Sequence, residues 1–321
     1  MRYFDLHCDT ITKCSDKNKE LFHNDLHISL ERAAGYATWA QFFAVWTPDK
    51  TNGDEAEKRF WKTYAAFTTQ IGKNKNLIDF CGNAKDLEQA VAAGKQIAML
   101  SIEGAVCLNG RLELIDEFYH KGVRLLSLTW NDRCITADGC MTPDAQGLTP
   151  FGREVIRRMG RLGMVADVSH LSEKGFWEIA RLTDRPFVAS HSNSAAVCAH
   201  KRNLTDDQLK EIVNREGLVG LNLYTEFIRR GKPPVRVEDL LSHIDHILSL
   251  GGENVLAIGS DFDGATMPQG IKGVEDMAKL HGMISEKFGA DTADKIFFEN
   301  AFRFFKTALT DCESCNNIIE L

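Results

Sequence analysis

The sequence predicts an α/β fold, a (β/α)8 TIM barrel with an added C-terminal helix. Short apolar runs rich in β-branched and aromatic residues alternate with helix-like segments along most of the chain. Eight such runs can be counted, which is the strand number of this barrel. A doubly wound open sheet would also alternate, but no Gly-x-Gly-x-x-Gly follows a predicted strand. We find no linker, repeat or low-complexity segment, so we expect one domain over residues 1–321.

The predicted strands each have a local justification. The first is the apolar run that ends in His7-Cys8-Asp9, and the second is rich in aromatic residues. The sixth begins at Pro186, where a missing N–H is tolerated. In order, the expected strands cover 5–10, 36–46, 96–103, 122–130, 163–170, 186–191, 217–224 and 254–261.

The predicted helices lie between and after these strands. Ser29 and Ser172 precede two of them as caps, and Thr205 with Gln208 forms a capping box. The helix over 237–248 has one apolar face, and we expect His243 and His246 beside that face to be solvated. The expected helices cover 30–34, 54–72, 112–120, 149–162, 172–182, 205–214, 237–248, 274–288 and 293–309.

Composition excludes several function classes. The chain has 321 residues, 44% hydrophobic, with a net charge of −7 and no basic stripe, so we expect no nucleic-acid partner. Met1 leads directly into the first strand and no apolar run is long enough for a membrane span, so we expect neither a signal peptide nor a membrane anchor. Nine scattered cysteines favour a reducing compartment, and we expect a cytoplasmic protein. Cys312 and Cys315 form a lone C-x-x-C, which we interpret as ordinary thiols.

Ionisable side chains stand at the ends of the predicted strands. In a barrel of this class the chemistry lies where the strands end, so these side chains should meet at one mouth. Three imidazoles and three carboxylates are about the inventory that two divalent metal ions need, with one carboxylate between them. The six residues are His7, Asp9, Glu103, His170, His191 and Asp261.

Each residue also has a structural interpretation. His7 alone could be a buried histidine bonded to backbone, and Asp9 could cap the next turn. Glu103 is harder to explain, because a carboxylate that ends an apolar strand must find a partner or water. The coincidence of six strand ends favours a metal site. The chain has neither Gly-x-Ser-x-Gly nor His-Glu-x-x-His, which disfavours a serine hydrolase and a helix-based zinc peptidase.

Two residues suggest how a substrate is handled. Asp261, near the expected metals, is suited to carry a proton from water to a leaving amine. Arg202 follows the sixth strand, and its guanidinium suits a substrate carboxylate, although a surface-loop arginine is the alternative interpretation.

These motifs resemble the membrane (renal) dipeptidase family of the amidohydrolase superfamily. The resemblance is carried, in order, by His7-Cys8-Asp9, 101–104, 167–170, 190–192, 201–204 and 259–264, and it covers most of the chain. It implies two zinc ions per chain, one held by His7 and Asp9, the other by His170 and His191, with Glu103 bridging. It also implies that Asp261 is the catalytic acid/base, that Arg202 binds the substrate carboxylate, that Tyr224 lies near the substrate pocket, and that the chain forms a homodimer.

The chain departs from the family pattern after the fourth strand. Family members have a histidine there that contacts the reacting carbonyl, whereas this chain has Trp130 followed by Asn131. We expect one of these two residues to donate to the substrate instead.

We therefore expect a zinc-dependent dipeptidase that hydrolyses the peptide bond of small L-L and L-D dipeptides by metal-activated hydroxide attack. One alternative is a metal-dependent amidohydrolase acting on N-acyl amino acids, lactams or lactones, with Trp130 reshaping the site. An alternative of another class is a non-catalytic barrel that binds metal or peptides.

Overall fold

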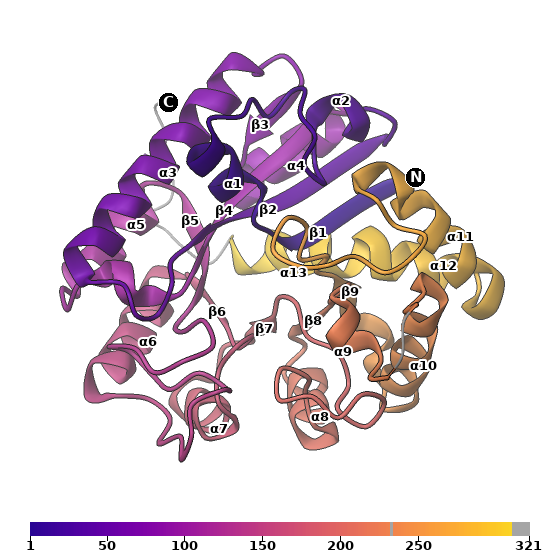
Figure 1. Cartoon of the computed structure of the whole chain (residues 1–321). Coiled ribbons are helices and arrows are strands. Elements are labelled where there is room, and N and C mark those ends of the chain that lie inside the picture. Colours follow the sequence, from indigo (N-terminus) through magenta and orange to yellow (C-terminus); the bar gives the residue numbers. More distant parts are fainter. Residues whose placement is uncertain (232–233, 310–321) are drawn as a thin grey trace.

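The structure, a computed structural model, describes residues 1–231 and 234–309. Eight parallel strands close into a barrel, because β1 pairs with both β2 and β9 and β2 pairs with β4 (Figure 1). The predicted barrel is confirmed. Its strands are β1 (Arg2–Cys8), β2 (Thr38–Trp46), β4 (Gln96–Glu103), β5 (Val123–Ser127), β6 (Val165–Asp167), β7 (Val188–Ala189), β8 (Leu218–Leu221) and β9 (Leu256–Ile258).

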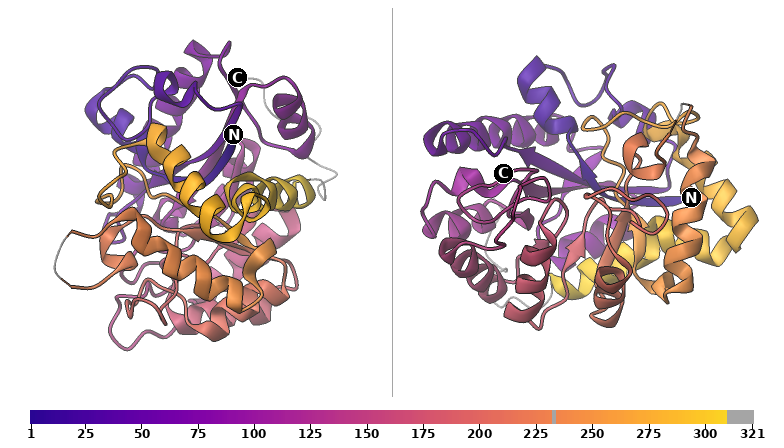
Figure 2. Two further views of the ribbon diagram at one scale, coloured as in Figure 1. Left: turned by 90° about the vertical axis from the view of Figure 1, so that its right-hand side faces the viewer. Right: turned by 60° about the horizontal axis from the view of Figure 1, so that its bottom comes forward.

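Helices form an outer layer around the strands (Figure 2). Among the residues that the structure describes, no helix combines the length and the apolar character needed to cross a membrane. The helices are α1 (Thr10–Lys17), α2 (Leu30–Ala33), α3 (Gly53–Lys73), α4 (Ala84–Ala92), α5 (Glu113–His120), α6 (Pro150–Leu162), α7 (Glu173–Leu182), α8 (Asp206–Asn214), α9 (Thr225–Ile228), α10 (Leu241–Ser249), α11 (Met277–Phe288), α12 (Ala290–Asp294) and α13 (Asn300–Ala308).

Several elements lie where none was predicted, among them β3 (Ile78–Phe80), α4, α1 and α9. The short strand β3 pairs with the start of β4 outside the closed ring. Helix α4 follows it and is capped by Asn83, whose side chain accepts from the Asp86 N–H at 2.8 Å. Helix α1 begins directly after Asp9. The Cys312 and Cys315 pair lies outside the described residues.

The expectation for His243 is wrong. This side chain on α10 is completely buried. Its Nδ1 accepts from the Ser194 N–H at 3.2 Å, and its Nε2 donates to the Ile228 carbonyl at 2.8 Å. His243 therefore fastens the loop after β7 to the helix layer.

The barrel interior is apolar at the N-terminal end of the strands, and α13 closes this end. Side chains from β1, β2, β4 and β5 to β9 meet residues of α13 in one buried cluster. The Phe305 ring lies 4.7 Å from that of Phe42 and 5.7 Å from that of Phe4, measured between centroids. The C-terminal helix thus acts as a plug at the N-terminal end of the strands.

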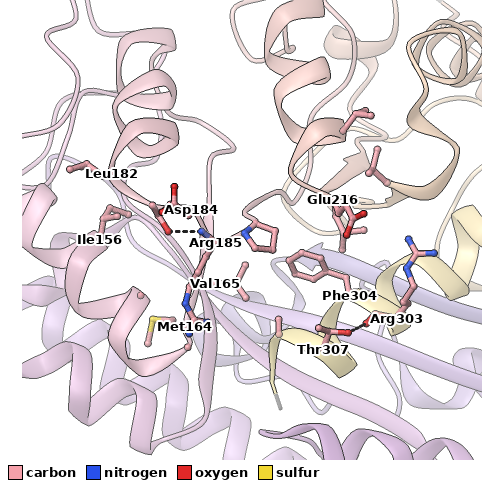
Figure 3. A pocket seen from close by; sticks show the side chains of 18 of the residues that line it. Ile156, Met164, Val165, Leu182, Asp184, Arg185, Glu216, Arg303, Phe304 and Thr307 are labelled. Carbon is pink, nitrogen blue, oxygen red and sulfur yellow. Dashed lines mark hydrogen bonds between the residues drawn. The ribbon is translucent and has the colours of Figure 1, made fainter. Parts of the chain in front are cut away.

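A large cavity of about 1210 Å³ lies at this same end, between α6, α8 and α13. Phe304 and Arg303 of α13 line one side, and Met164 and Val165 at the start of β6 line the other (Figure 3). The strand ends that carry the predicted metal ligands lie at the opposite end of the barrel, so this cavity is not the reaction site.

The plug can be tested by truncating Phe305. Phe305→Ala removes a fully buried ring and should lower the free energy of unfolding by about 3–5 kcal/mol. Chemical denaturation measures this, with Phe22→Ala as the control because Phe22 is 42% exposed. A loss below about 1 kcal/mol would contradict the plug.

Candidate metal centre and active site

The structure brings the six predicted residues together at the C-terminal mouth of the barrel. They lie in or just after five strands: His7 in β1 and Asp9 after it, Glu103 in β4, His170 after β6, His191 after β7 and Asp261 after β9. Two overlapping groups have ligand atoms within 4.8 Å of one another, one of His7, Glu103 and His191, the other of His7, Asp9 and Asp261. All are buried except Asp261, which is partly exposed.

Glu103 lies between two sets of ligands. Its Oε2 is 3.4 Å from His7 Nε2, and His7 Nε2 is 3.7 Å from Asp9 Oδ2. Its Oε1 is 2.7 Å from His170 Nε2 and 3.6 Å from His191 Nε2. Each carboxylate oxygen therefore faces a different ligand pair, which is the arrangement of a bridging ligand.

A bulge in β1 directs the His7 side chain toward the C-terminal mouth of the barrel. Tyr3 packs in the outer core, and strict alternation would put His7 on that same face. Between Asp5 and Cys8, however, β1 contains one more residue than the paired stretch of β2. Such a bulge redirects the side chains that follow it. His7 and Asp9 do converge, as predicted, but the bulge rather than alternation alone accounts for it.

The Nδ1 atom of His191 is fixed by a buried hydrogen-bond chain. The Ser190 hydroxyl donates to Asp167 Oδ2 at 2.6 Å and lies 2.7 Å from His191 Nδ1. Because the hydroxyl has given its one proton to the carboxylate, it must accept from His191 Nδ1–H. The Nε2 atom of His191 is then left with a free lone pair.

His170 is oriented in a similar way. Its Nδ1 lies 2.9 Å from Asn131 Oδ1, an amide oxygen that can only accept. Nδ1 therefore carries the proton, and Nε2 has a free lone pair. Asn131, predicted to bind substrate, thus holds a candidate ligand, and its direct contact with substrate stays a prediction.

The Nε2 lone pairs of His170 and His191 converge without a proton between them. His170 Nε2 and His191 Nε2 are 2.8 Å apart, and both face Glu103 Oε1. His7 Nε2 and Asp9 Oδ1 are buried and have no hydrogen-bond partner. Buried acceptors without a donor are costly, and a cation would satisfy them. The residues present therefore fit divalent metal ions.

The surroundings keep Glu103 ionised and His170 and His191 neutral. Burial acts to raise the pKa of Glu103, but His7 and His170 beside it bring that pKa below its ordinary value. Burial lowers the pKa of His170 to about 3, and the nearby Arg202 guanidinium adds to this shift. Burial and His7 likewise lower the pKa of His191. His170 and His191 are thus neutral ligands. Glu103 and Asp9, acting against burial, raise the pKa of His7 above its ordinary value, so a metal ion held by His7 would displace a proton.

Asp261 is held by a residue that was not predicted. Asn222, after β8, donates from Nδ2 to Asp261 Oδ2 at 3.1 Å and to the His191 carbonyl at 3.2 Å. Burial raises the pKa of Asp261 to about 7, and the carboxylates of Asp9 and Glu103 add to the rise. Asn222 is a polar residue in an apolar strand end, the signal that could have identified it.

Arg202 lies inside the site and not on a surface loop. It is 4% exposed, and its Nη2 donates to the His191 carbonyl at 3.3 Å. Its guanidinium lies 5.2 Å from the Phe227 ring centroid, and the Tyr224 ring packs edge-on against the same phenylalanine at 4.7 Å. Arg202 Nε is buried without a partner. Arg202 and Tyr224, both predicted to bind substrate, therefore pack against the same Phe227 ring.

Trp130 stands at the rim beside His170. Their ring centroids are 6.4 Å apart, and the Trp46 ring meets Trp130 edge-on at 5.3 Å. Asp49, which was not predicted, accepts from the N–H groups of Trp130 at 2.8 Å and Asp132 at 2.6 Å. Asp49 thus fixes the backbone of this loop.

Two glycines let the backbone of His191 enter the barrel mouth. A Cβ on Gly220 or on Gly259 would lie 1.8 Å from the Ser190 carbonyl oxygen, and one on Gly259 would also lie 3.1 Å from the His191 Cα. No side chain at either position is compatible with the present course of the chain after β7.

Replacing Gly259 tests this constraint. Gly259→Ala should displace Ser190 and His191, lower the free energy of unfolding by about 1–3 kcal/mol, and weaken divalent-metal binding in competition with a chelating dye. The control is Gly282→Ala on α11, where a Cβ meets nothing within 4 Å. That control should stabilise the chain by up to about 1 kcal/mol. Unchanged metal affinity in Gly259→Ala would refute the constraint.

Comparison with known proteins agrees with this geometry. The family profile "Membrane dipeptidase (Peptidase family M19)" matches residues 1–317. A protein of Klebsiella pneumoniae from the pqqA 5′ region, itself uncharacterized, is 33% identical over 257 residues, 77% of this chain and 94% of that protein. An uncharacterized dipeptidase of Schizosaccharomyces pombe is 36% identical over 221 residues, 67% of this chain and 52% of that protein.

Two solved structures resemble the whole fold. The dipeptidase AC, a metallopeptidase of family M19, superposes with a TM-score of 0.89 at 30% identity and covers 96% of this chain and 99% of its own. A metallopeptidase of Rhodobacter sphaeroides, liganded with a phosphinate mimic of L-Ala-D-Ala, gives a TM-score of 0.88 at 29% identity and covers 95% and 99%. The chain therefore belongs to the membrane dipeptidase family, peptidase family M19, and is a metallo-dipeptidase.

Proposed function

We propose that this metallo-dipeptidase uses two zinc ions to hydrolyse small L-L and L-D dipeptides. The observation that carries the proposal is the convergence of buried imidazole nitrogens on the Glu103 carboxylate. Imidazole nitrogens with carboxylate oxygens are a donor set that suits zinc. His7 and Asp9 would hold one ion and His170 and His191 the other, with Glu103 between them. Bound there, the ions would activate water and polarise the peptide carbonyl.

The chain supplies the groups that orient the substrate. The partly unpaired guanidinium of Arg202 suits the substrate carboxylate, and the carboxyl group of Asp261 suits its free amine. The His191 carbonyl accepts from both Arg202 Nη2 and Asn222 Nδ2, and Asn222 also holds Asp261. The two recognition groups are therefore fixed relative to one another, which selects short substrates with both termini free.

Asp261 would also move the proton. It lies in the same group of ligand atoms as His7 and Asp9, next to the place where water would be activated. A carboxyl group in this position can take a proton from the attacking water and give it to the leaving amine. The hydrogen bond from Asn222 Nδ2 fixes the direction of Asp261 Oδ2.

Stereochemistry, cell location and assembly stay proposals. The relative bound to a mimic of L-Ala-D-Ala supports a D-residue on the carboxyl side. All seven cysteines within the described part of the chain are free thiols, which agrees with a cytoplasmic location. A homodimer follows from family resemblance alone.

One observation favours the alternative function, the hydrolysis of N-acyl amino acids. Trp130 brings an apolar ring, and not a charged donor, to the rim beside His170. Membership in a dipeptidase family disfavours the non-catalytic alternative.

Glu103→Gln tests the metal centre. The amide keeps the shape but loses the charge between the two ligand sets, so the variant should bind fewer than two zinc ions per chain. Dipeptide turnover should fall about thousandfold or more, because several kcal/mol of transition-state stabilisation depend on the metals. Elemental analysis and amine release measure the two effects, with the exposed Glu117→Gln on α5 as the control. Full metal loading together with full activity in Glu103→Gln would exclude this role.

A matched substrate pair tests recognition of the amine. L-Ala-L-Ala and propionyl-L-alanine differ only in the α-amino group that Asp261 would engage. We expect kcat/KM to be about hundredfold or more higher for the dipeptide, the order of losing one partner of a buried charged contact. Equal or faster hydrolysis of propionyl-L-alanine would favour the N-acyl amino acid alternative instead.

A further inference from the structure

A second cavity, of about 780 Å³, leads away from the candidate metal centre. It starts at His170, Ser192 and Arg202 and extends outward to Trp177 on α7 and Gln208 on α8. The cavity is therefore continuous with the place where the carboxyl-side residue of a dipeptide would lie. Its volume is within the range of pockets that hold small molecules.

The lining of this cavity is strongly basic. Besides the candidate ligand His170, its cationic or titratable basic members are Lys174, His200, Lys201, Arg202 and Arg230, and the carboxylate among the lining residues is Glu173. Glu226 acts electrostatically on His200 without lining the cavity. This basic lining contrasts with the net charge of −7 of the whole chain.

Two of these cations have no partner among the residues that the structure describes. Within residues 1–231 and 234–309, no carboxylate lies within ion-pair distance of Lys201 or Arg230, and neither side chain donates a hydrogen bond. Lys174, in contrast, donates to Gln146 Oε1 at 3.0 Å. Arg202 is assigned to the α-carboxylate of the substrate, so Lys201 and Arg230 remain for a second anionic group.

We propose that this basic cavity selects dipeptides with an acidic residue, Asp or Glu, on the carboxyl side. The inference rests on the proposed function, because it assumes that Arg202 holds the α-carboxylate. A side-chain carboxylate on the same residue then lies at the entrance of the cavity, where Lys201 and Arg230 attract it. Both cations are exposed, so the attraction is electrostatic and is screened by salt.

Isosteric substrates test the preference. The zinc-loaded full chain is given L-Ala-L-Glu, L-Ala-L-Gln, L-Ala-D-Glu and L-Ala-D-Gln, and release of the carboxyl-side residue is followed. We expect kcat/KM to be about tenfold higher for at least one Glu substrate than for its Gln isostere, the scale of electrostatic focusing in a charged cleft. The ratio should shrink as the salt concentration rises.

The double variant Lys201→Gln with Arg230→Gln should bring the Glu-to-Gln ratio close to one and remove its salt dependence. Lys210→Gln removes an exposed lysine of α8 that does not line the cavity, and it should keep the wild-type ratio. A wild-type ratio near one for both pairs, or an unchanged ratio in the double variant, would overturn this inference alone. Hydrolysis of none of the four substrates would overturn the proposed function and this inference with it.

Discussion

The site depends on the burial of several imidazole and carboxylate groups whose ligand atoms face one another. Glu103 faces His7 on one side and His170 and His191 on the other. Asp167, through Ser190, fixes the proton of His191 on Nδ1, and Asn131 does the same for His170. The cost of such a cluster is large without a cation. The surrounding chain therefore prepares His170 and His191 for metal binding before any metal arrives, whereas His7, whose pKa is raised by Glu103 and Asp9, would lose a proton when metal binds.

The two ends of the barrel have opposite character. At the N-terminal end, aromatic side chains of α13 fill the interior and contribute stability through apolar contacts. At the C-terminal end, the interior is polar, and the glycines Gly220 and Gly259 let the backbone of His191 approach closely. Stability and chemistry are thus separated along the barrel axis, as is usual in this fold.

The sequence predicted the barrel and the residues at its strand ends, because both follow from local patterns. An apolar run predicts a strand, and an ionisable residue that ends the run must lie at the mouth. Contacts between segments that lie far apart in the sequence could not be predicted in this way. The bulge near His7, the role of Asp167, and the burial of His243 depend on which segments the fold brings together. Strand β3 was not predicted because three residues are too few to show a periodic pattern. In contrast, the cap residue Asn83 could have indicated helix α4.

The central claim is that the acceptors around Glu103 hold two divalent ions. Anomalous diffraction from crystals of the zinc-loaded chain, collected on both sides of the zinc absorption edge, tests it most directly. We expect two anomalous peaks, one beside His7 and Asp9 and one beside His170 and His191, with Glu103 between them. One peak, or two peaks that do not share Glu103, would contradict it.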